Sequence, residues 1–296
     1  MINVNSFVTK SMKINKIRPQ DNVFTSRIGD IVLKHEILYY RGKLPEKRLK
    51  SVAIVGARKP TRYGEECAYK IGKELAKNGI VIISGLALGI DAMAHRAALD
   101  GGGTTIAVLG SGVDDITPRS NYALGERILA SGGAIISEYC PGTPAYPTSF
   151  LERNRIVSGL ADAVIVVEAA AKSGTLSTAA HALGQGRHVF AIPGNINNPM
   201  SIGCNRLIKQ GAFPLMEVND VLEVIAPEKM EQMEFEILGD SEAENQLIKL
   251  LRGGMRDGEV LRRELKMSAS EFNQMATVME LKGSIRNLGA NQWALR

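Results

Sequence analysis

The stretch VEAAAKSGTLSTAAHALGQGRHVFAIPG, residues 167–194, contains one complete unit of a parallel α/β fold. It begins at the end of an apolar run, continues through Lys-Ser-Gly-Thr and a series of small residues, and ends in a second apolar run followed by Pro-Gly. This order predicts a strand, a turn of the size that holds a phosphate, a helix and a second strand. A nucleotide that is cleaved, a nucleotide that is only held and the backbone of a nucleic acid would each suit such a turn.

Similar apolar runs recur along the chain. Six of them occupy residues 52–55, 80–83, 105–109, 134–137, 163–167 and 188–192. Near-continuous runs of β-branched and small apolar residues are typical of strands that are covered on both faces, as in parallel sheets. Helical patterns lie between them, for example over residues 63–79, 90–102 and 120–133. The alternation predicts a doubly wound α/β sheet with right-handed crossovers.

The pattern changes on both sides of this core, which we place at residues 46–225. Residues 1–45 are basic and show no clear pattern, although residues 35–46 are suited to an added strand and turn. Residues 226–241 are polar, acidic and rich in methionine, which is typical of a linker. Residues 242–296 contain three helical stretches and a short extended ending, an order that predicts a small winged-helix domain.

The composition and charge of the chain disfavour several classes of protein, namely membrane proteins, secreted proteins and proteins built on zinc sites or disulfides. The chain has 296 residues, 45% of them hydrophobic, and no apolar run approaches the ~20 residues that a membrane span needs. The N-terminus has no secretory signal pattern, so we expect a cytoplasmic protein without membrane partners. The three cysteines are far apart and form no CxxC pair, which disfavours zinc sites and disulfide frameworks. The net charge of +5 is distributed as +7 over residues 1–50, −4 over 51–240 and +2 over 241–296. An anion site in the slightly acidic core must therefore be built locally.

Loops rich in glycine and small polar residues follow the predicted core strands. Because the carboxyl ends of parallel strands share one edge of the sheet, we expect these loops to form an anion or phosphate site together. Two arginines that open the helix before the fifth core strand lie close to the same edge, and Arg155 is also placed to brace a carboxylate such as Glu168. The predicted site residues are Gly56, Arg58, Ser84, Gly85, Gly110, Arg153, Arg155, Lys172, Ser173, Gly174 and Thr175.

Known nucleotide motifs are absent from these loops. The Lys172–Thr175 turn lacks the spacing of a P-loop, since its lysine precedes the glycine. Arg58 stands where a dinucleotide-binding turn has its second glycine, which disfavours nicotinamide cofactors but suits bidentate contact with a phosphate. Asp91 opens a helix, where capping is its simplest role. No nucleophile is paired with a base, so we expect no catalytic residue, no metal and no cofactor.

Several long motifs resemble those of the DNA processing protein A family, also called DprA or Smf. They are VAIVGARKPTRYG, ISGLALGIDAMAHRAAL, SEYCPGTP, FLERNRIVSGLADAVIVVEAAAKSGTLSTA and GRHVFAIPGNI, in the expected order over about residues 50–215. The resemblance implies an extended Rossmann-like fold that forms a homodimer and binds single-stranded DNA. It also implies a non-catalytic protein that protects incoming strands during natural transformation and loads the RecA recombinase. By this resemblance, we expect the family's N-terminal domain, related to SAM domains, to be absent or reduced to residues 1–45, and Asp115–Pro118 departs from the usual Tyr-Pro.

Two other functions remain as alternatives. One is a nucleotide phosphoribohydrolase of the lysine-decarboxylase-like (LOG) type, whose PGGxGTxxE motif carries a glutamate that is replaced here by Ser177 and Thr178. The other is a nucleotide-sensing regulator that binds a ligand with its core and duplex DNA with its winged helix. By resemblance, the winged helix is a possible duplex DNA site in the first function as well. DNA held through its backbone would be bound with weak sequence preference and strong salt dependence.

Overall fold

The computed structural model describes residues 13–229 and 239–295, apart from residues 30, 32, 34 and 35. The chain divides into two compact units, Met1–Ala226 and Pro227–Arg296. The described part of the first unit contains one large sheet, and residues 239–295 of the second contain three helices and a hairpin. The linker predicted for residues 226–241 lies largely outside the described residues.

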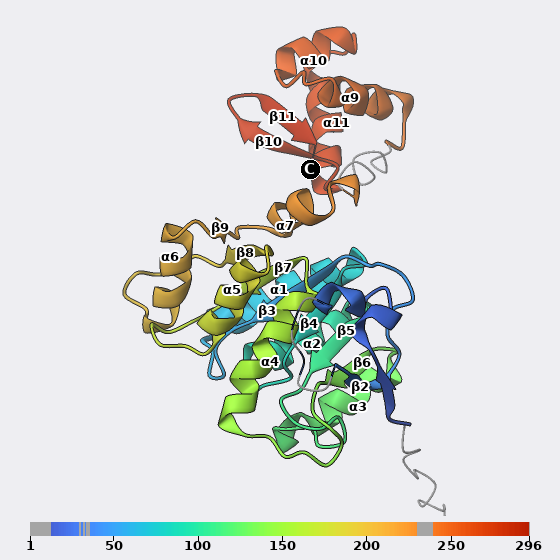
Figure 1. The fold of residues 1–296 in the computed structure, drawn as a ribbon. Coiled ribbons are helices and arrows are strands. Elements are labelled where there is room, and N and C mark those ends of the chain that lie inside the picture. The colour runs from blue at the N-terminus through green and yellow to red at the C-terminus, as the bar shows by residue number, and fades with distance from the viewer. Residues whose placement is uncertain (1–12, 30, 32, 34–35, 230–238, 296) are drawn as a thin grey trace, which may run out of the picture. The chain divides into compact units, whose positions relative to one another are not determined.

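The sheet of the first unit has nine strands in the order β1-β2-β6-β5-β4-β3-β7-β8-β9 (Figure 1). All neighbours from β6 to β9 are parallel, whereas β1 and β2 pair antiparallel at one edge. The strands are β1 Asn15–Ile17, β2 Leu38–Gly42, β3 Ser51–Val55, β4 Val81–Ser84, β5 Thr105–Val108, β6 Ala134–Ser137, β7 Ala163–Val166, β8 His188–Ala191 and β9 Phe213–Pro214. Each of the six predicted runs forms a strand, which confirms the predicted fold class.

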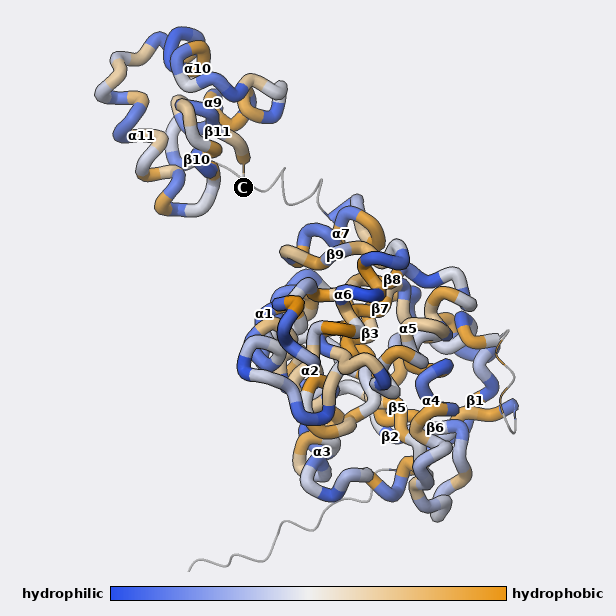
Figure 2. The backbone as a smooth tube through the Cα atoms, turned by 90° about the vertical axis from the view of Figure 1, so that its left-hand side faces the viewer, coloured by the Kyte–Doolittle hydropathy of each residue, from blue (hydrophilic) through white to orange (hydrophobic). Residues whose placement is uncertain are grey.

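Helices cover both faces of this sheet (Figure 2). On one face lie α1 (Arg62–Lys77), α2 (Ile90–Asp100) and α3 (Tyr122–Ala130), and on the other lie α4 (Pro147–Leu160) and α5 (Thr175–Gly184). Every residue of β3 to β7 is buried, because side chains on either face of these strands meet a helix. The continuous apolar runs in the sequence follow from this two-sided cover.

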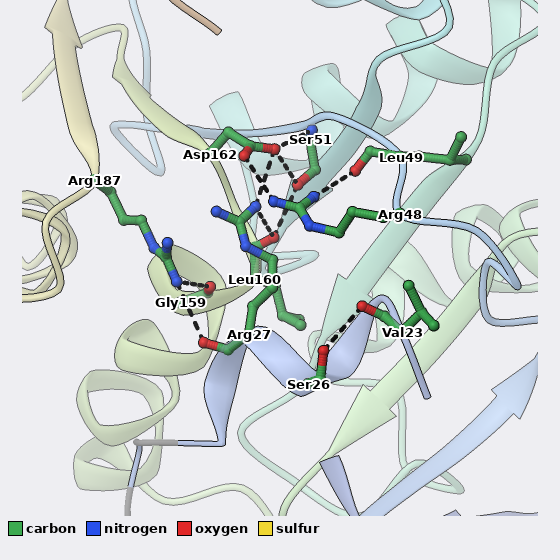
Figure 3. Close-up of polar contacts among 10 residues, drawn as sticks. All are labelled: Val23, Ser26, Arg27, Arg48, Leu49, Ser51, Gly159, Leu160, Asp162 and Arg187. Carbon is green, nitrogen blue, oxygen red and sulfur yellow. Dashed lines mark hydrogen bonds and ion pairs between the residues drawn. The ribbon is translucent and has the colours of Figure 1, made fainter. Parts of the chain in front are cut away.

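Part of the basic N-terminal segment belongs to the same sheet. Within residues 35–46, β2 is the added strand that the sequence predicted, and it pairs with β6. Arg27 of the 3₁₀ turn η2 (Thr25–Ile28) and Arg48 each approach the carboxylate of Asp162 to 2.9 Å (Figure 3). The same carboxylate accepts the backbone N–H of Ser51 at 2.9 Å. One acidic side chain thus joins the N-terminal segment to the starts of β3 and β7.

The first unit ends with elements that the sequence analysis did not predict. After β8 come the turn η4 (Pro199–Ser201), α6 (Ile202–Lys209), the two-residue β9 and α7 (Val218–Ile225). Two further 3₁₀ turns, η1 (Pro19–Asp21) and η3 (Arg119–Asn121), lie earlier in the chain. These pieces are short, and short elements leave weak periodic patterns.

The second unit has its own hydrophobic core, in which Phe272 packs edge-on against Trp293. Its elements are α9 (Glu242–Arg252), α10 (Gly258–Glu264), α11 (Ala269–Leu281), β10 (Ile285–Gly289) and β11 (Gln292–Leu295). Three helices followed by an antiparallel hairpin is the predicted order, and the assignment as a winged helix stays a prediction. Within the described part of the chain, no helix combines the length and the apolar character needed to cross a membrane.

Candidate functional site

A cavity of about 300 Å³ lies where the direction of the sheet topology reverses. The chain passes from β3 to β4 on one side of β3, whereas β7 and β8 follow on its other side. In open α/β sheets, ligands bind at the carboxyl ends of the strands at this switch point. The cavity is lined by Val55, Gly56, Arg58, Ala87, Asp91, Phe150, Leu151, Arg153, Asn154, Ser173, Gly174, Thr175 and Thr178.

Arg58 is the basic residue on the rim of the cavity. Its guanidinium carbon lies 5.3 Å from the centroid of the Phe150 ring. Within the described residues, it has no carboxylate partner within 4.0 Å. The backbone at Arg58 runs close to Gly89, whose φ of +75° suits glycine and where a Cβ would overlap the carbonyl of Ala57. This close approach constrains the turn that carries Arg58. Because Arg58 has no carboxylate partner there, its positive charge is available to an anion.

The turn after β7 forms the opposite wall. Thr175 donates its hydroxyl to the Gly56 carbonyl at 3.0 Å, which ties this turn to the one that follows β3. The Ser173 hydroxyl accepts the N–H of Thr175 at 3.2 Å at the start of α5. The positive end of the α5 dipole therefore lies at the cavity beside Arg58, where it favours an anion. Lys172 is exposed and lies outside the cavity lining.

Arg153 forms the floor of the cavity and not its rim. Its side chain is buried, and it donates hydrogen bonds to the carbonyls of Gly85, at 2.6 Å, and Val108. Burial lowers the pKa of Arg153, while the nearby Asp91 carboxylate opposes this shift. Burial raises the pKa of Asp91, and Arg153 counteracts that rise. The opposite charges of Arg153 and Asp91 thus offset part of each other's cost of burial. The positive charge of Arg153, which we expected to contact an anion, is therefore already partly balanced by Asp91.

Arg155 lies outside the cavity lining. It forms an ion pair with the buried Glu138 at 2.5 Å, so it braces a carboxylate as we expected, but that carboxylate is Glu138 and not Glu168. Glu168 instead accepts the backbone N–H of Thr61 at 2.8 Å and the hydroxyl of Thr61 at 2.5 Å. The helical spacing in Arg-Asn-Arg separates the two arginines by two positions, which places them on different faces of α4.

Ser84, Gly85 and Gly110 of the remaining predicted loops lie outside the cavity lining and contact residues near it or in it. The Ser84 hydroxyl donates to the Ile54 carbonyl at 2.7 Å, and the N–H of Gly85 donates to Asp91 at 3.1 Å. A Cβ at Gly85 would overlap the guanidinium of Arg153, and a Cβ at Gly110 would lie 3.1 Å from Cδ1 of Phe150. Of the eleven predicted residues, the structure brings together six in the lining: Gly56, Arg58, Arg153, Ser173, Gly174 and Thr175.

Sequence reasoning missed part of the lining. Asp91 was expected only to cap a helix, and Phe150, Leu151 and Thr178 were not singled out. Phe150 and Leu151 precede Arg153 by one helical turn or less, so the helix that carries the Arg-Asn-Arg motif was the available signal. A further buried polar group, His95, lies outside this lining on α2.

The described residues contain no cluster of three or more His, Cys, Asp and Glu side chains that could hold a metal ion. The buried imidazole of His95 forms a 2.7 Å hydrogen bond with the hydroxyl of Thr105, and burial lowers its pKa to about 3. His181 is half-buried, and burial lowers its pKa as well. His95 is completely buried within α2, whereas His181 is not among the buried residues of α5.

Residues 15–226 match the model of the family described as DNA recombination-mediator protein A. The chain belongs to this family. It is 47% identical over 186 residues to Protein Smf of Escherichia coli, a match that covers 63% of this chain and 50% of that protein. It is 41% identical over 202 residues to DNA processing protein DprA of Streptococcus pneumoniae, covering 68% and 71% of the two chains. The matched region is thus about half of the E. coli relative.

Two solved structures of this family share the fold. DprA from S. pneumoniae superposes with a TM-score of 0.66 and 38% identity, covering 72% of this chain and 75% of the other. A structure described as giving insights into the single-stranded DNA binding mode of DNA processing protein A from Helicobacter pylori superposes with a TM-score of 0.62 and 32% identity. That match covers 72% of this chain and 95% of the other. The predicted family and its Rossmann-like core are confirmed.

Proposed function

We propose that this chain binds single-stranded DNA and that the cavity at the switch point holds phosphates of its backbone. The observation that carries the proposal is the arrangement of Arg58 beside the Ser173–Thr175 turn at the N-terminus of α5. The solved relative from H. pylori, whose description names a single-stranded DNA binding mode, supports the choice of ligand. Lys172, exposed next to the cavity, would contact a phosphate along the path of the strand.

The chemistry of the lining agrees with recognition of a backbone. Arg58 and the hydroxyl groups of Ser173 and Thr175 donate to phosphate oxygens, which are common to all sequences. Phe150 is the one aromatic residue among the lining residues. We therefore expect weak sequence preference and an affinity that falls steeply with salt.

We also propose that the chain is not an enzyme. In the LOG-type alternative, a glutamate near the start of the corresponding helix performs the chemistry. Here the hydroxyl of Ser177 donates to the Gly174 carbonyl at 2.8 Å, and Thr178 is buried. Neither side chain supplies a carboxylate, and Asp91, the acid of the lining, is paired with Arg153 by electrostatics.

The partners form the outer part of the proposal. By family membership we propose a homodimer that protects incoming strands and transfers them to RecA during transformation and recombination, in the cytoplasm. A contact of the second unit with duplex DNA has the least support, because α11 contains Glu271 and Glu280 but no lysine or arginine. The helix that reads the major groove in such modules is normally basic enough to contact phosphates.

Fluorescence anisotropy with labelled single-stranded and duplex oligonucleotides in a salt series tests the proposal. We expect tight, salt-sensitive binding of single strands that is lost in Arg58→Glu/Lys172→Glu. The control is Lys77→Glu/Arg127→Glu, which makes the same change of charge at the ends of α1 and α3, on the opposite edge of the sheet. Duplex-only binding that is insensitive to both pairs would overturn the proposal and leave the cavity to a nucleotide.

A further inference from the structure

A second cavity, of about 670 Å³, is formed by the segment that leads from β5 to the start of α3. It is lined by Asp114, Asp115, Ile116, Thr117, Arg119 and Tyr122. Ile116 is buried, whereas the charged side chains and the Tyr122 ring are exposed. These residues are separate from the lining of the cavity at the switch point, and they include the stretch that departs from the usual Tyr-Pro of the family.

One buried side chain connects the two cavities. Asn121, which is 3% exposed, donates its amide to the carbonyls of Leu86, at 2.9 Å, and Ala87, at 3.1 Å. Ala87 lines the cavity at the switch point, whereas Tyr122, which follows Asn121, lines the second cavity. The two loops follow β4 and β5, which are neighbours in the sheet. Because neighbouring strands of a sheet lie about 5 Å apart, a DNA chain held in one cavity passes close to the other.

The charged side chains of the second cavity differ in how far they are already engaged. Asp114 accepts the backbone N–H of Gly142 at 2.9 Å. Asp115 and Arg119 are exposed, and within the described part of the chain neither has an oppositely charged side chain within 4.0 Å. The second cavity therefore offers an available carboxylate and an available guanidinium together with an exposed aromatic ring.

We propose that the second cavity holds a nucleobase of the bound single strand and that it prefers guanine. The inference rests on the proposed function, because the cavity at the switch point would hold the DNA backbone next to this base. Single-strand binding proteins stack bases on exposed aromatic side chains, and Tyr122 provides such a surface. Arg119 offsets part of the acidic charge of the second cavity, which would otherwise repel the phosphates of the strand.

The preference for guanine follows from the chemistry of Asp115. An ionised carboxylate accepts hydrogen bonds and donates none. Among the four bases, guanine is the one whose Watson–Crick edge presents two adjacent donors, the N1–H and the 2-amino group. In a single strand this edge is open to a side chain. The two oxygens of Asp115 can accept both donors, whereas the other bases present one donor beside an acceptor.

Fluorescence anisotropy with an all-thymine strand, and with strands of the same length that carry one guanine, inosine or adenine, tests the inference. We expect the wild type to bind the guanine strand about fivefold more tightly than the all-thymine strand, the lower end of the range for one bidentate contact. Inosine keeps the N1–H and lacks the 2-amino group, so its strand should lose most of this gain. Equal binding of the guanine and inosine strands would overturn the assignment of Asp115.

Two neighbouring acidic residues provide a matched pair of variants. Asp115→Asn should remove the preference for guanine without weakening the binding of the all-thymine strand, since it removes a negative charge. Asp114→Asn makes the same change of charge at a carboxylate that is already engaged with Gly142, so it should keep the preference. A purely electrostatic role for Asp115 would change the affinity for all four strands equally in both variants, which would contradict base recognition.

Tyr122 is tested separately. Tyr122→Ala should weaken the binding of every strand about fivefold or more, because it removes the stacking surface. Tyr122→Phe keeps the ring and should bind as the wild type does, and thermal melting shows whether each variant is folded. Unchanged affinity in Tyr122→Ala would remove the stacking role. If the wild type binds all four strands equally, this inference fails and the proposed function stands; if it binds none, the proposed function fails as well.

Discussion

The Nη2 atom of Arg155 lies 2.5 Å from Oε2 of Glu138, a carboxylate that is completely buried. This ion pair commits the second arginine of the Arg-Asn-Arg motif to the interior of the fold. The two arginines of the motif, two positions apart, therefore interact with different carboxyl groups, since Arg153 lies beside Asp91. Both arginines of the motif therefore have partners within the fold, Arg153 in the carbonyls of Gly85 and Val108 and Arg155 in Glu138.

The first prediction concerns this pair. Arg155→Ala removes a charge that compensates the buried Glu138, so we expect the free energy of unfolding to fall by about 3 kcal/mol in a urea titration. Adding Glu138→Gln should recover part of the loss. Single-stranded DNA affinity should fall less than in Arg58→Ala, and a larger fall would return Arg155 to the binding surface.

The second prediction concerns acid stability and His95. The folded pKa of about 3 lies below the ordinary value of 6.5, so the unfolded chain takes up a proton here that the folded chain does not. The stability contribution is present above pH 6.5 and is lost as the pH falls from 6.5 toward 3, at about 1.4 kcal/mol per pH unit. His95→Gln should reduce the pH slope of the unfolding free energy by that amount between pH 6 and 4.5. Identical slopes in both proteins would show that His95 does not titrate in this way.

The third prediction concerns Asp162. Burial alone would raise the pKa of this carboxyl, but hydrogen bonding to Arg48 and the charges of Arg27 and Arg48 outweigh burial and lower it. Burial, together with Arg187 and Arg48, also lowers the pKa of Arg27 to about 10. Asp162→Asn should therefore reduce the free energy of unfolding by about 3 kcal/mol, because the buried Arg27 loses its counter-charge.

The control for this prediction is Asp100→Asn, which removes the partner of Arg127 from a pair whose side chains are 40% and 56% exposed. Exposed pairs contribute between 0 and about 1 kcal/mol. A titration with urea that gives equal losses for the two variants would show that the Asp162 cluster has no special role. Because the pKa of Asp162 is lowered only in the folded chain, its ionised carboxylate contributes to stability at pH values above the ordinary pKa of an aspartate. This contribution to stability is lost as the pH falls below that pKa.

The fourth prediction concerns Gly85. An alanine here places a methyl group on the guanidinium of Arg153, so it should displace that side chain from the carbonyls of Gly85 and Val108. We expect a loss of about 2 kcal/mol or more in unfolding free energy. Gly184→Ala, where a Cβ meets no atom within 4 Å, is the control, and equal stability of the two variants would contradict the geometry at the cavity floor.

The core strands were predictable because each is buried on both faces and therefore appears as a continuous apolar run. The short elements were not, since β9 has two residues and α7 has eight. β2 was detected as a strand but not placed, because its partner β6 lies far along the chain and local pattern carries no information on register.

The candidate site was predictable as an edge of the sheet but not as a set of contacts. The glycine loops indicated where the strands end, and six of the eleven residues meet in one cavity. Whether an arginine faces solvent or the interior depends on tertiary partners such as Glu138 and the Val108 carbonyl, which no local pattern identifies. Phe150 was not predicted as a lining residue for the same reason, because its contact with Arg58 joins two elements that are far apart in the sequence.

The pairing of β2 with β6 has a consequence for how the chain is assembled during synthesis. Tyr39 of β2 lies opposite Ser137 of β6, and the ion pair between Arg27 and Asp162 joins the N-terminal segment to the start of β7. The N-terminal segment therefore leaves the ribosome well before the strands to which it binds, and the loop between them has to close first. Strand β2 and Arg27 are therefore among the last parts of this unit to reach their final positions, and until then the edge of β6 remains open to other chains.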